Sequence, residues 1–117
     1  MPINNDSVVY ISGPMSGLPD YGRQMMKFVE SFVKENFPDA TVINPADVPP
    51  EWTWEQAMEK DVDDVSTNAT VMVLLDGWEK SRGARIEVGI ALRRNLEIVM
   101  FRDLMAEKFK GTVQYKS

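Results

Sequence analysis

The apolar run Thr70–Leu75 (TVMVLL) is the feature that most constrains the fold of this chain. A strand without polar alternation has to be covered on both faces, which is typical of the centre of a parallel sheet. Short runs of β-branched and apolar residues at Ser7–Ser12, Thr41–Asn44 and Glu97–Phe101 predict three further strands. We expect the last of these strands to be buried as well.

Segments with helical spacing separate the predicted strands. The first has apolar residues at Met25, Phe28, Val29, Phe32 and Val33. The second begins at the N-cap Thr53, with Gln56 completing a capping box. The predicted helices cover about Tyr21–Asn36, Thr53–Asn68, Ala84–Arg94 and Leu104–Phe109.

Regular alternation of strands and helices predicts an α/β fold with a doubly wound, mostly parallel sheet of the Rossmann or flavodoxin type. We expect about four or five strands in the order 2-1-3-4, with helices on both faces. Ligands of such sheets bind beyond the carboxyl ends of the strands, where the strand order reverses. This crevice would lie between the loops Gly13–Pro19 and Asp76–Gly83, which are rich in Gly, Ser and Pro.

The composition removes several classes of chemistry. The chain of 117 residues suits a single domain, residues 1–117. It contains neither Cys nor His, which excludes disulfides, thiol nucleophiles and histidine-based triads. Acid–base chemistry therefore falls to Asp, Glu, Tyr or Lys, and we expect neither a metal site nor a cofactor.

The charge of the chain argues against nucleic-acid polymers as partners. The formal net charge is −5, whereas proteins that bind duplexes carry a basic face. No stretch approaches the roughly 20 apolar residues that span a membrane, and the N-terminus lacks a signal pattern. We expect a cytoplasmic protein without membrane contact.

Glu87 is the strongest candidate for a functional carboxylate. It lies in the third predicted helix between apolar neighbours, and Gly89 should let another element pack close. An ordinary glutamate that is favoured by the helix dipole is the alternative interpretation. Ser81 and Gly83 precede it near the N-terminus of this helix, where free N–H groups favour an anion.

Two further groups of residues have both a functional and a structural interpretation. Asp61, Asp63 and Asp64 form a charge run that usually marks a solvated face, but Asp61 lies at the edge of the apolar face and is able to point inward. Among the tryptophans, Trp78 in the crevice loop is the better candidate for stacking on a base. Trp52 and Trp54 more often serve core or rim packing.

Four segments together resemble a known family. They are Tyr10–Gly17 (YISGPMSG), Ile43–Pro45 (INP), Lys60-Asp61 and Leu74–Ala91 (LLDGWEKSRGARIEVGIA), within roughly Val8–Phe101. The chain resembles the nucleoside 2-deoxyribosyltransferase superfamily, which includes the 2'-deoxynucleoside 5'-monophosphate N-glycosidases, and within it a small branch common in phages and prophages. The resemblance implies an enzyme that cleaves the N-glycosidic bond of a nucleotide or nucleoside.

The resemblance also implies roles for individual residues. Glu87, within the pattern Gly83–Gly89 (GARIEVG), would be the nucleophile, and Tyr10 would hydrogen-bond to it. Asp61 would engage the departing base, although an insertion in the alignment leaves Asp64 as an alternative. The implied substrate-binding residues are Gly13, Met15, Ser16, Asn44, Ser81 and Gly83.

Ser81 bears on the choice of substrate. Nucleoside transferases carry an Asp at this position, whereas the monophosphate-hydrolysing branch carries a Ser that helps to bind the 5'-phosphate. The implied mechanism is retaining: a covalent glycosyl-enzyme forms on Glu87, and water or a second base then completes hydrolysis or transfer. Glu87 should be ionised and Asp61 protonated. Relatives complete the site with a neighbouring subunit, so we expect a homodimer or a higher homo-oligomer.

Three other functions stay open at this point. A non-catalytic nucleotide-binding module of the same fold would bind its ligand without releasing a base. A glycosidase for a dinucleotide-type substrate is disfavoured by the short chain. A purely structural partner protein would leave the polar crevice loops unexplained. The sequence leaves open the identity of the base, ribose against 2'-deoxyribose, and hydrolysis against transfer.

Overall fold

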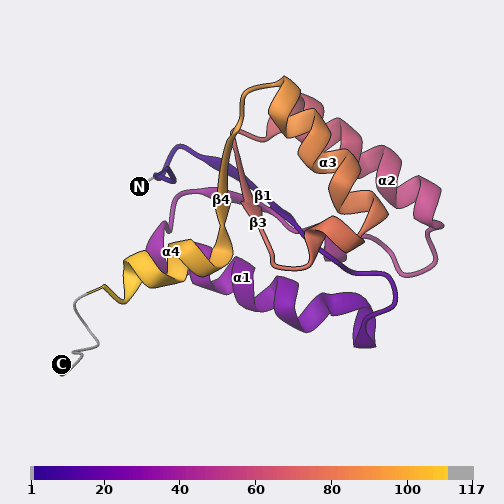
Figure 1. The fold of residues 1–117 in the computed structure, drawn as a ribbon, viewed down its shortest axis with the longest axis horizontal. Helices are drawn as coiled ribbons and strands as arrows, with labels where there is room; N and C mark the ends of the chain where they lie inside the picture. Colours follow the sequence, from indigo (N-terminus) through magenta and orange to yellow (C-terminus); the bar gives the residue numbers. More distant parts are fainter. Residues whose placement is uncertain (1, 111–117) are drawn as a thin grey trace.

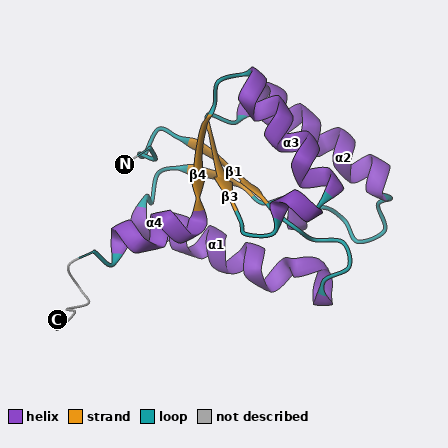
Figure 2. Cartoon of the chain, in the orientation of Figure 1, coloured by secondary structure: helices purple, strands orange, loops and turns teal. Residues whose placement is uncertain are grey.

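A computed structural model describes residues 2–110 as a four-stranded parallel sheet in the order β2-β1-β3-β4 (Figures 1 and 2). The strands are β1 (Val8–Ser12), β2 (Thr41–Ile43), β3 (Val71–Leu74) and β4 (Glu97–Met100). The main helices are α1 (Arg23–Asn36), α2 (Trp54–Asp63), α3 (Arg82–Arg93) and α4 (Phe101–Lys108). The predicted doubly wound fold and its strand order are confirmed.

The helices cover the two faces of the sheet in pairs. In Figure 1, α1 and α4 lie on one side of the sheet, and α2 and α3 lie on the other. The buried residues accordingly form two clusters. Val9 and Ile11 of β1 point into the cluster that contains Val29 of α1. Tyr10, between them, points into the cluster that contains Val88 of α3, as the alternation of side chains along a strand requires.

The central strands β1 and β3 are buried, but β4 is not buried as we predicted. β3 is buried over its whole length. In β4, Glu97 is exposed and the next three residues are only half buried, because β4 is the edge of the sheet. Phe101, which we expected to end this strand, begins α4 instead.

Helix α1 starts later than predicted, and only part of its predicted apolar face is buried. Asp20, Tyr21 and Gly22 have left-handed φ values of 54°, 51° and 68°, so the α-helix begins only at Arg23. Of the apolar residues with helical spacing, Val29, Phe32 and Val33 are buried, whereas Met25 and Phe28 are 52% and 51% exposed. Met26 fills the core in their place.

Capping side chains fix the residues at which α2 and α3 begin. The predicted capping box of Thr53 and Gln56 is present at α2, and a π-helical turn (Asp64–Asn68) follows this helix. Helix α3 begins at Arg82, two residues earlier than predicted, because Ser81 caps it by accepting a hydrogen bond from the N–H of Ala84.

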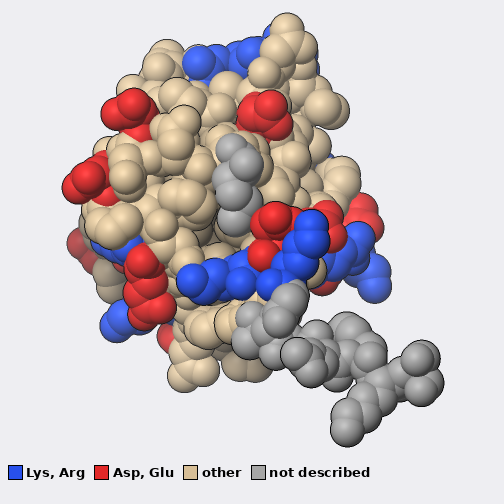
Figure 3. Space-filling view, turned by 90° about the vertical axis from the view of Figure 1, so that its left-hand side faces the viewer, with Lys and Arg blue, Asp and Glu red and all other residues tan. Residues whose placement is uncertain are grey.

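Charged side chains of both signs share the surface near α4 and the N-terminus. On the face shown in Figure 3, Lys and Arg lie interspersed with Asp and Glu. None of the helices within residues 2–110 is long and apolar enough to cross a lipid bilayer.

Two glycines provide a matched test of the packing at the end of β1. A Cβ at Gly13 would lie 2.7 Å from Cβ of Leu75, so Gly13→Ala should lower the free energy of unfolding by about 1–3 kcal/mol. At Gly89 the nearest atom to an added Cβ is Nη1 of Arg93, 4.0 Å away, so our expectation of close packing there was wrong. Gly89→Ala should stabilise α3 by up to about 1 kcal/mol.

Urea denaturation of the two variants and the wild-type protein measures both effects. Equal stability of the two variants would contradict the close contact between Gly13 and Leu75.

Candidate active site

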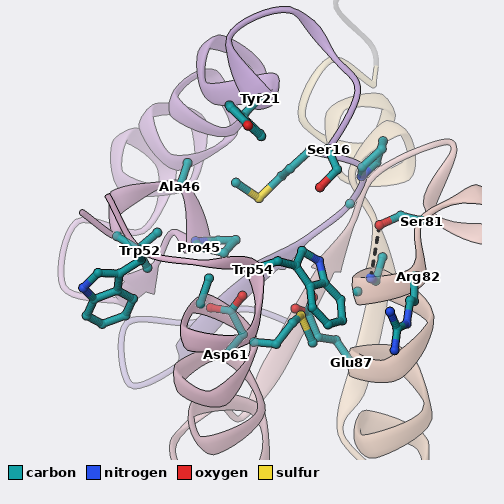
Figure 4. Close-up of a pocket in the computed structure, with 18 of the residues that line it drawn as sticks. Ser16, Tyr21, Pro45, Ala46, Trp52, Trp54, Asp61, Ser81, Arg82 and Glu87 are labelled. Carbon is teal, nitrogen blue, oxygen red and sulfur yellow. Dashed lines mark hydrogen bonds between the residues drawn. The ribbon is translucent and has the colours of Figure 1, made fainter. Parts of the chain in front are cut away.

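A cavity of about 400 Å³ lies at the carboxyl end of β1, which is the position predicted from the strand order. Its walls come from the loop 13–16, the segment 45–54, the first turns of α2, and residues 80–84 at the start of α3 (Figure 4). Glu87 and Asp61 both line it. The volume falls within the range of about 300–1,000 Å³ that is usual for small-molecule sites.

Glu87 is held by two hydroxyl groups of β1. It lies in the second turn of α3 and is only 5% exposed. The hydroxyl of Tyr10 donates a hydrogen bond of 3.1 Å to Oε2 of Glu87, and the hydroxyl of Ser12 donates one of 2.7 Å to Oε1. The bond expected between Tyr10 and Glu87 is therefore present. Ser12 is a contact that the sequence motifs did not indicate.

Asp61 carries an unsatisfied polar atom into the same cavity. Its side chain is 6% exposed, and Oδ1 is buried without a hydrogen-bond partner among residues 2–110. Buried polar atoms normally have partners, so this oxygen is suited to bind a ligand group. Asp64, the alternative left open by the motifs, does not line the cavity. Its carboxylate pairs with Lys60 and accepts a hydrogen bond from Asn68.

Burial raises the pKa of both carboxyl groups of the cavity. The pKa of Glu87 rises to about 8 and that of Asp61 to about 6, in each case mainly through burial. Burial also raises the pKa of Tyr10, and the carboxyl groups of Glu87 and Asp61 raise it further. The two carboxyl pKa values are separated, as predicted, but in the opposite order: Glu87 holds its proton to a higher pH than Asp61.

Most of the predicted substrate-binding residues converge on the cavity. Gly13, Met15 and Ser16 line it from the first loop, and Ser81 and Gly83 line it from the start of α3. Figure 4 shows Ser16 and Ser81 on the same side of the cavity.

Asn44 does not line the cavity, so its predicted contact with substrate is not supported by the geometry. Its side chain is buried and serves the local structure. Oδ1 accepts a hydrogen bond from the N–H of Ala46, and Nδ2 donates one to Glu30. The Asn thus caps the short helical turn Pro45–Asp47.

The tryptophans that line the cavity are Trp52 and Trp54, not Trp78. Trp52 and Trp54 line the cavity at the start of α2, and Figure 4 shows Trp54 close to Asp61 and Glu87, with Trp52 farther to the left. The guanidinium of Arg82 lies over the ring of Trp54, 4.6 Å from its centre. Trp78, the predicted stacking residue, packs against the apolar cluster below α3.

Within residues 2–110, no group of three or more His, Cys, Asp or Glu side chains is arranged to hold a metal ion. The polar side chains that line the cavity carry carboxyl, hydroxyl, guanidinium and ammonium groups. Such a set fits acid–base and nucleophilic chemistry on a substrate with an anionic group.

Comparisons with known proteins agree with this fold. A family model described as "Domain of unknown function (DUF4406)" matches residues 7–100, so the chain belongs to this family. No curated protein matches the sequence. Among solved structures, a 2-desoxiribosyltransferase from Leishmania mexicana is similar, with a TM-score of 0.63 and 19% sequence identity.

The similarity covers 80% of this chain and 63% of the Leishmania chain, so this chain spans less than two thirds of that enzyme. At this identity the likeness shows the fold alone. The deoxyribosyltransferase-like fold that the motifs implied is thereby confirmed, and the phage-associated branch stays a prediction.

The raised pKa of Glu87 makes a prediction about stability. The unfolded chain releases this proton near pH 4.5, whereas the folded protein keeps it to about pH 8. Release of this proton therefore stabilises the unfolded state as the pH rises between these values, and the free energy of unfolding falls. Glu87→Gln removes this titration. Between about pH 5 and pH 8, its free energy of unfolding should rise relative to that of the wild-type protein by at least about 1 kcal/mol.

Thermal denaturation at several pH values measures the difference. Glu59→Gln on the exposed side of α2 is the matched control for the same substitution outside the cavity. If the difference in stability between Glu87→Gln and the wild-type protein is the same at pH 5 and pH 8, the pKa of Glu87 is not raised.

Proposed function

We propose that the protein cleaves the N-glycosidic bond of a 2'-deoxynucleoside 5'-monophosphate or nucleoside, by hydrolysis or by transfer of the base. The observation that carries the proposal is the pair of buried carboxyl groups in one cavity: Glu87, held by Tyr10 and Ser12, and Asp61, with an unpartnered oxygen. A nucleophile fixed in place and a second carboxyl group within one cavity are the requirements of a retaining glycosidase.

The proposed reaction has two steps. In the first, an oxygen of Glu87 attacks C1' of the sugar, the C1'–N bond breaks, and its electron pair leaves with the base, which takes a proton from Asp61. A glycosyl ester on Glu87 results. In the second, a water molecule gives a proton to Asp61 as its oxygen attacks C1', and the carboxylate of Glu87 leaves. Attack by a second base in place of water would give transfer.

The protonation states limit the rate of this reaction. The reactive form has Glu87 ionised and Asp61 protonated, but with pKa values of about 8 and about 6 it is the minor form of the singly protonated pair. The hydroxyl donors of Tyr10 and Ser12 favour the ionised form of Glu87 and so enlarge this population.

The remaining walls of the cavity suit the other parts of a nucleotide. Trp52 and Trp54 offer aromatic faces on which a base can stack. Ser81 and Gly83 lie at the N-terminus of α3, where free N–H groups and the helix dipole favour a phosphate. The guanidinium of Arg82 adds a positive charge beside them.

Replacement of the nucleophile tests the proposal directly. Glu87→Ala should lower the release of free base from a panel of 2'-deoxynucleoside 5'-monophosphates by at least about 10²-fold, because a covalent catalyst supplies several kcal/mol of transition-state stabilisation. Chromatography of the free base measures the rate.

Asp61→Asn and Asp64→Asn form a matched pair for the second carboxyl group. Asp61→Asn removes the proton donor and should also lower base release. Asp64→Asn changes a carboxylate that pairs with Lys60 outside the cavity, so base release should stay nearly unchanged.

Turnover of Glu87→Ala near the wild-type rate would refute the proposed role of Glu87.

The proposed phosphate site predicts a change in substrate preference. Ser81→Asp keeps an N-cap residue at α3, since Asp and Ser cap helices about equally well, but places a negative charge beside the phosphate. It should raise KM for a monophosphate far more than for the matching nucleoside. Ser81→Asn, which caps the helix without a charge, is the control.

Steady-state kinetics with the two substrates decides this point. If Ser81→Asp raises both KM values alike, or if wild-type protein processes nucleosides as well as monophosphates, the phosphate does not bind at Ser81.

A non-catalytic nucleotide-binding module is the second candidate function. The high pKa of Glu87 favours it, because a carboxyl group that is protonated at neutral pH is a poor nucleophile. Such a module would bind 2'-deoxynucleotides without releasing a base, so the same chromatography separates the two functions. The expected homodimer stays a prediction in either case.

A further inference from the structure

Ser12 contacts Glu87 without lining the cavity itself. It is the last residue of β1 and is completely buried. Its hydroxyl donates the shorter of the two hydrogen bonds to Glu87, 2.7 Å to Oε1 against 3.1 Å from Tyr10 to Oε2. Burial of a hydroxyl is costly unless it is paired, and at Ser12 the carboxyl group of Glu87 is the partner.

The geometry of β1 places the two donors together. Tyr10 and Ser12 are two residues apart, so their side chains leave the strand on the same face. Each donor takes a different oxygen of the same carboxyl group. Two bonds to different oxygens fix the rotation of the carboxyl plane, which one bond would leave free.

The backbone at Ser12 is held firmly in turn. Its carbonyl accepts a hydrogen bond of 2.9 Å from the N–H of Leu75, just after β3. The next residue, Gly13, packs against the side chain of Leu75 with no space for a Cβ. The position of the Ser12 hydroxyl is therefore set by the two central strands of the sheet.

We propose that Ser12 is a positioning residue for Glu87, which orients the carboxyl group toward the cavity and favours its ionised, nucleophilic form. The catalytic part of this inference rests on the proposed function. An ionised carboxylate only accepts hydrogen bonds, so two hydroxyl donors stabilise it relative to the protonated group. The other titratable groups that face Glu87 are Tyr10 on β1 and Asp61 on α2, and Asp61 acts in the opposite direction because it carries a like charge.

Removal of the hydroxyl has a predicted effect on the titration of Glu87. Hydrogen bonds to charged groups are stronger than those between neutral groups, so Ser12→Ala should raise the pKa of Glu87 by about one to two units. Ser12→Cys, which keeps a weak donor of similar size, should give a smaller increase. Ser7→Ala removes another buried hydroxyl, which bonds only within the turn before β1, and should leave the titration unchanged.

The titration is measured by NMR on protein labelled with ¹³C at the glutamate carboxyl groups. The Glu87 signal is identified by its absence from Glu87→Gln. The same variants are assayed with the 2'-deoxynucleoside 5'-monophosphate that the wild-type protein cleaves fastest. Because Ser12 does not touch the substrate in this account, Ser12→Ala should lower kcat about 10-fold or more and leave KM within about two-fold.

The outcomes separate this inference from the proposed function. A raised Glu87 pKa together with a lowered kcat supports the role of Ser12, and partial recovery of both in Ser12→Cys strengthens it. An unchanged titration, or a wild-type kcat in Ser12→Ala, overturns it even if Glu87 is the nucleophile. If Glu87→Ala keeps full activity, the proposed function fails together with the catalytic part of this inference, and the titration alone decides whether Ser12 favours the ionised carboxyl group.

Discussion

The site depends on one interaction: the buried carboxyl group of Glu87 between the hydroxyls of Tyr10 and Ser12. A carboxyl group in an apolar interior is costly unless each oxygen finds a donor. Here the donors come from the central strand, while the carboxyl group comes from α3. The packing of α3 on the sheet and the orientation of Glu87 are thus parts of one arrangement, and a shift of either element would leave a buried polar group unpaired.

The second carboxyl group is placed by the end of α2. After Asp61 this helix continues into the π-helical turn Asp64–Asn68. The guanidinium of Arg94 donates hydrogen bonds of 2.6 Å and 2.9 Å to the carbonyls of Val65 and Ala69. Arg94 follows α3, so it ties the end of this helix to the end of α2. The helices that carry Glu87 and Asp61 are therefore linked at their C-terminal ends, away from the cavity.

The sequence was most informative where periodicity and position agree. The apolar run of β3 and the alternation of elements sufficed to predict the sheet order, and with it the place of the cavity. The glutamate pattern singled out Glu87. Contacts that depend on side-chain direction were not predictable. Ser12 was placed at the end of the first strand, but the pattern does not show which group its hydroxyl meets, and Asn44 looks like a ligand although its amide is used for capping. Trp78 was misplaced because it lies in the short helical turn Trp78–Lys80 and its ring packs against the buried cluster that contains Val88. β4 was expected to be buried because its composition does not reveal that it is an edge strand.

The stereochemistry of the reaction tests the central proposal most directly. If Glu87 forms a glycosyl ester, cleavage of a 2'-deoxynucleoside 5'-monophosphate in the presence of methanol proceeds through two displacements at C1'. Proton NMR of the methyl glycoside formed should then show the same β configuration as the substrate. A product of α configuration would mean direct attack on the substrate without a covalent intermediate. That result, or the absence of any base release, would contradict Glu87 as the nucleophile.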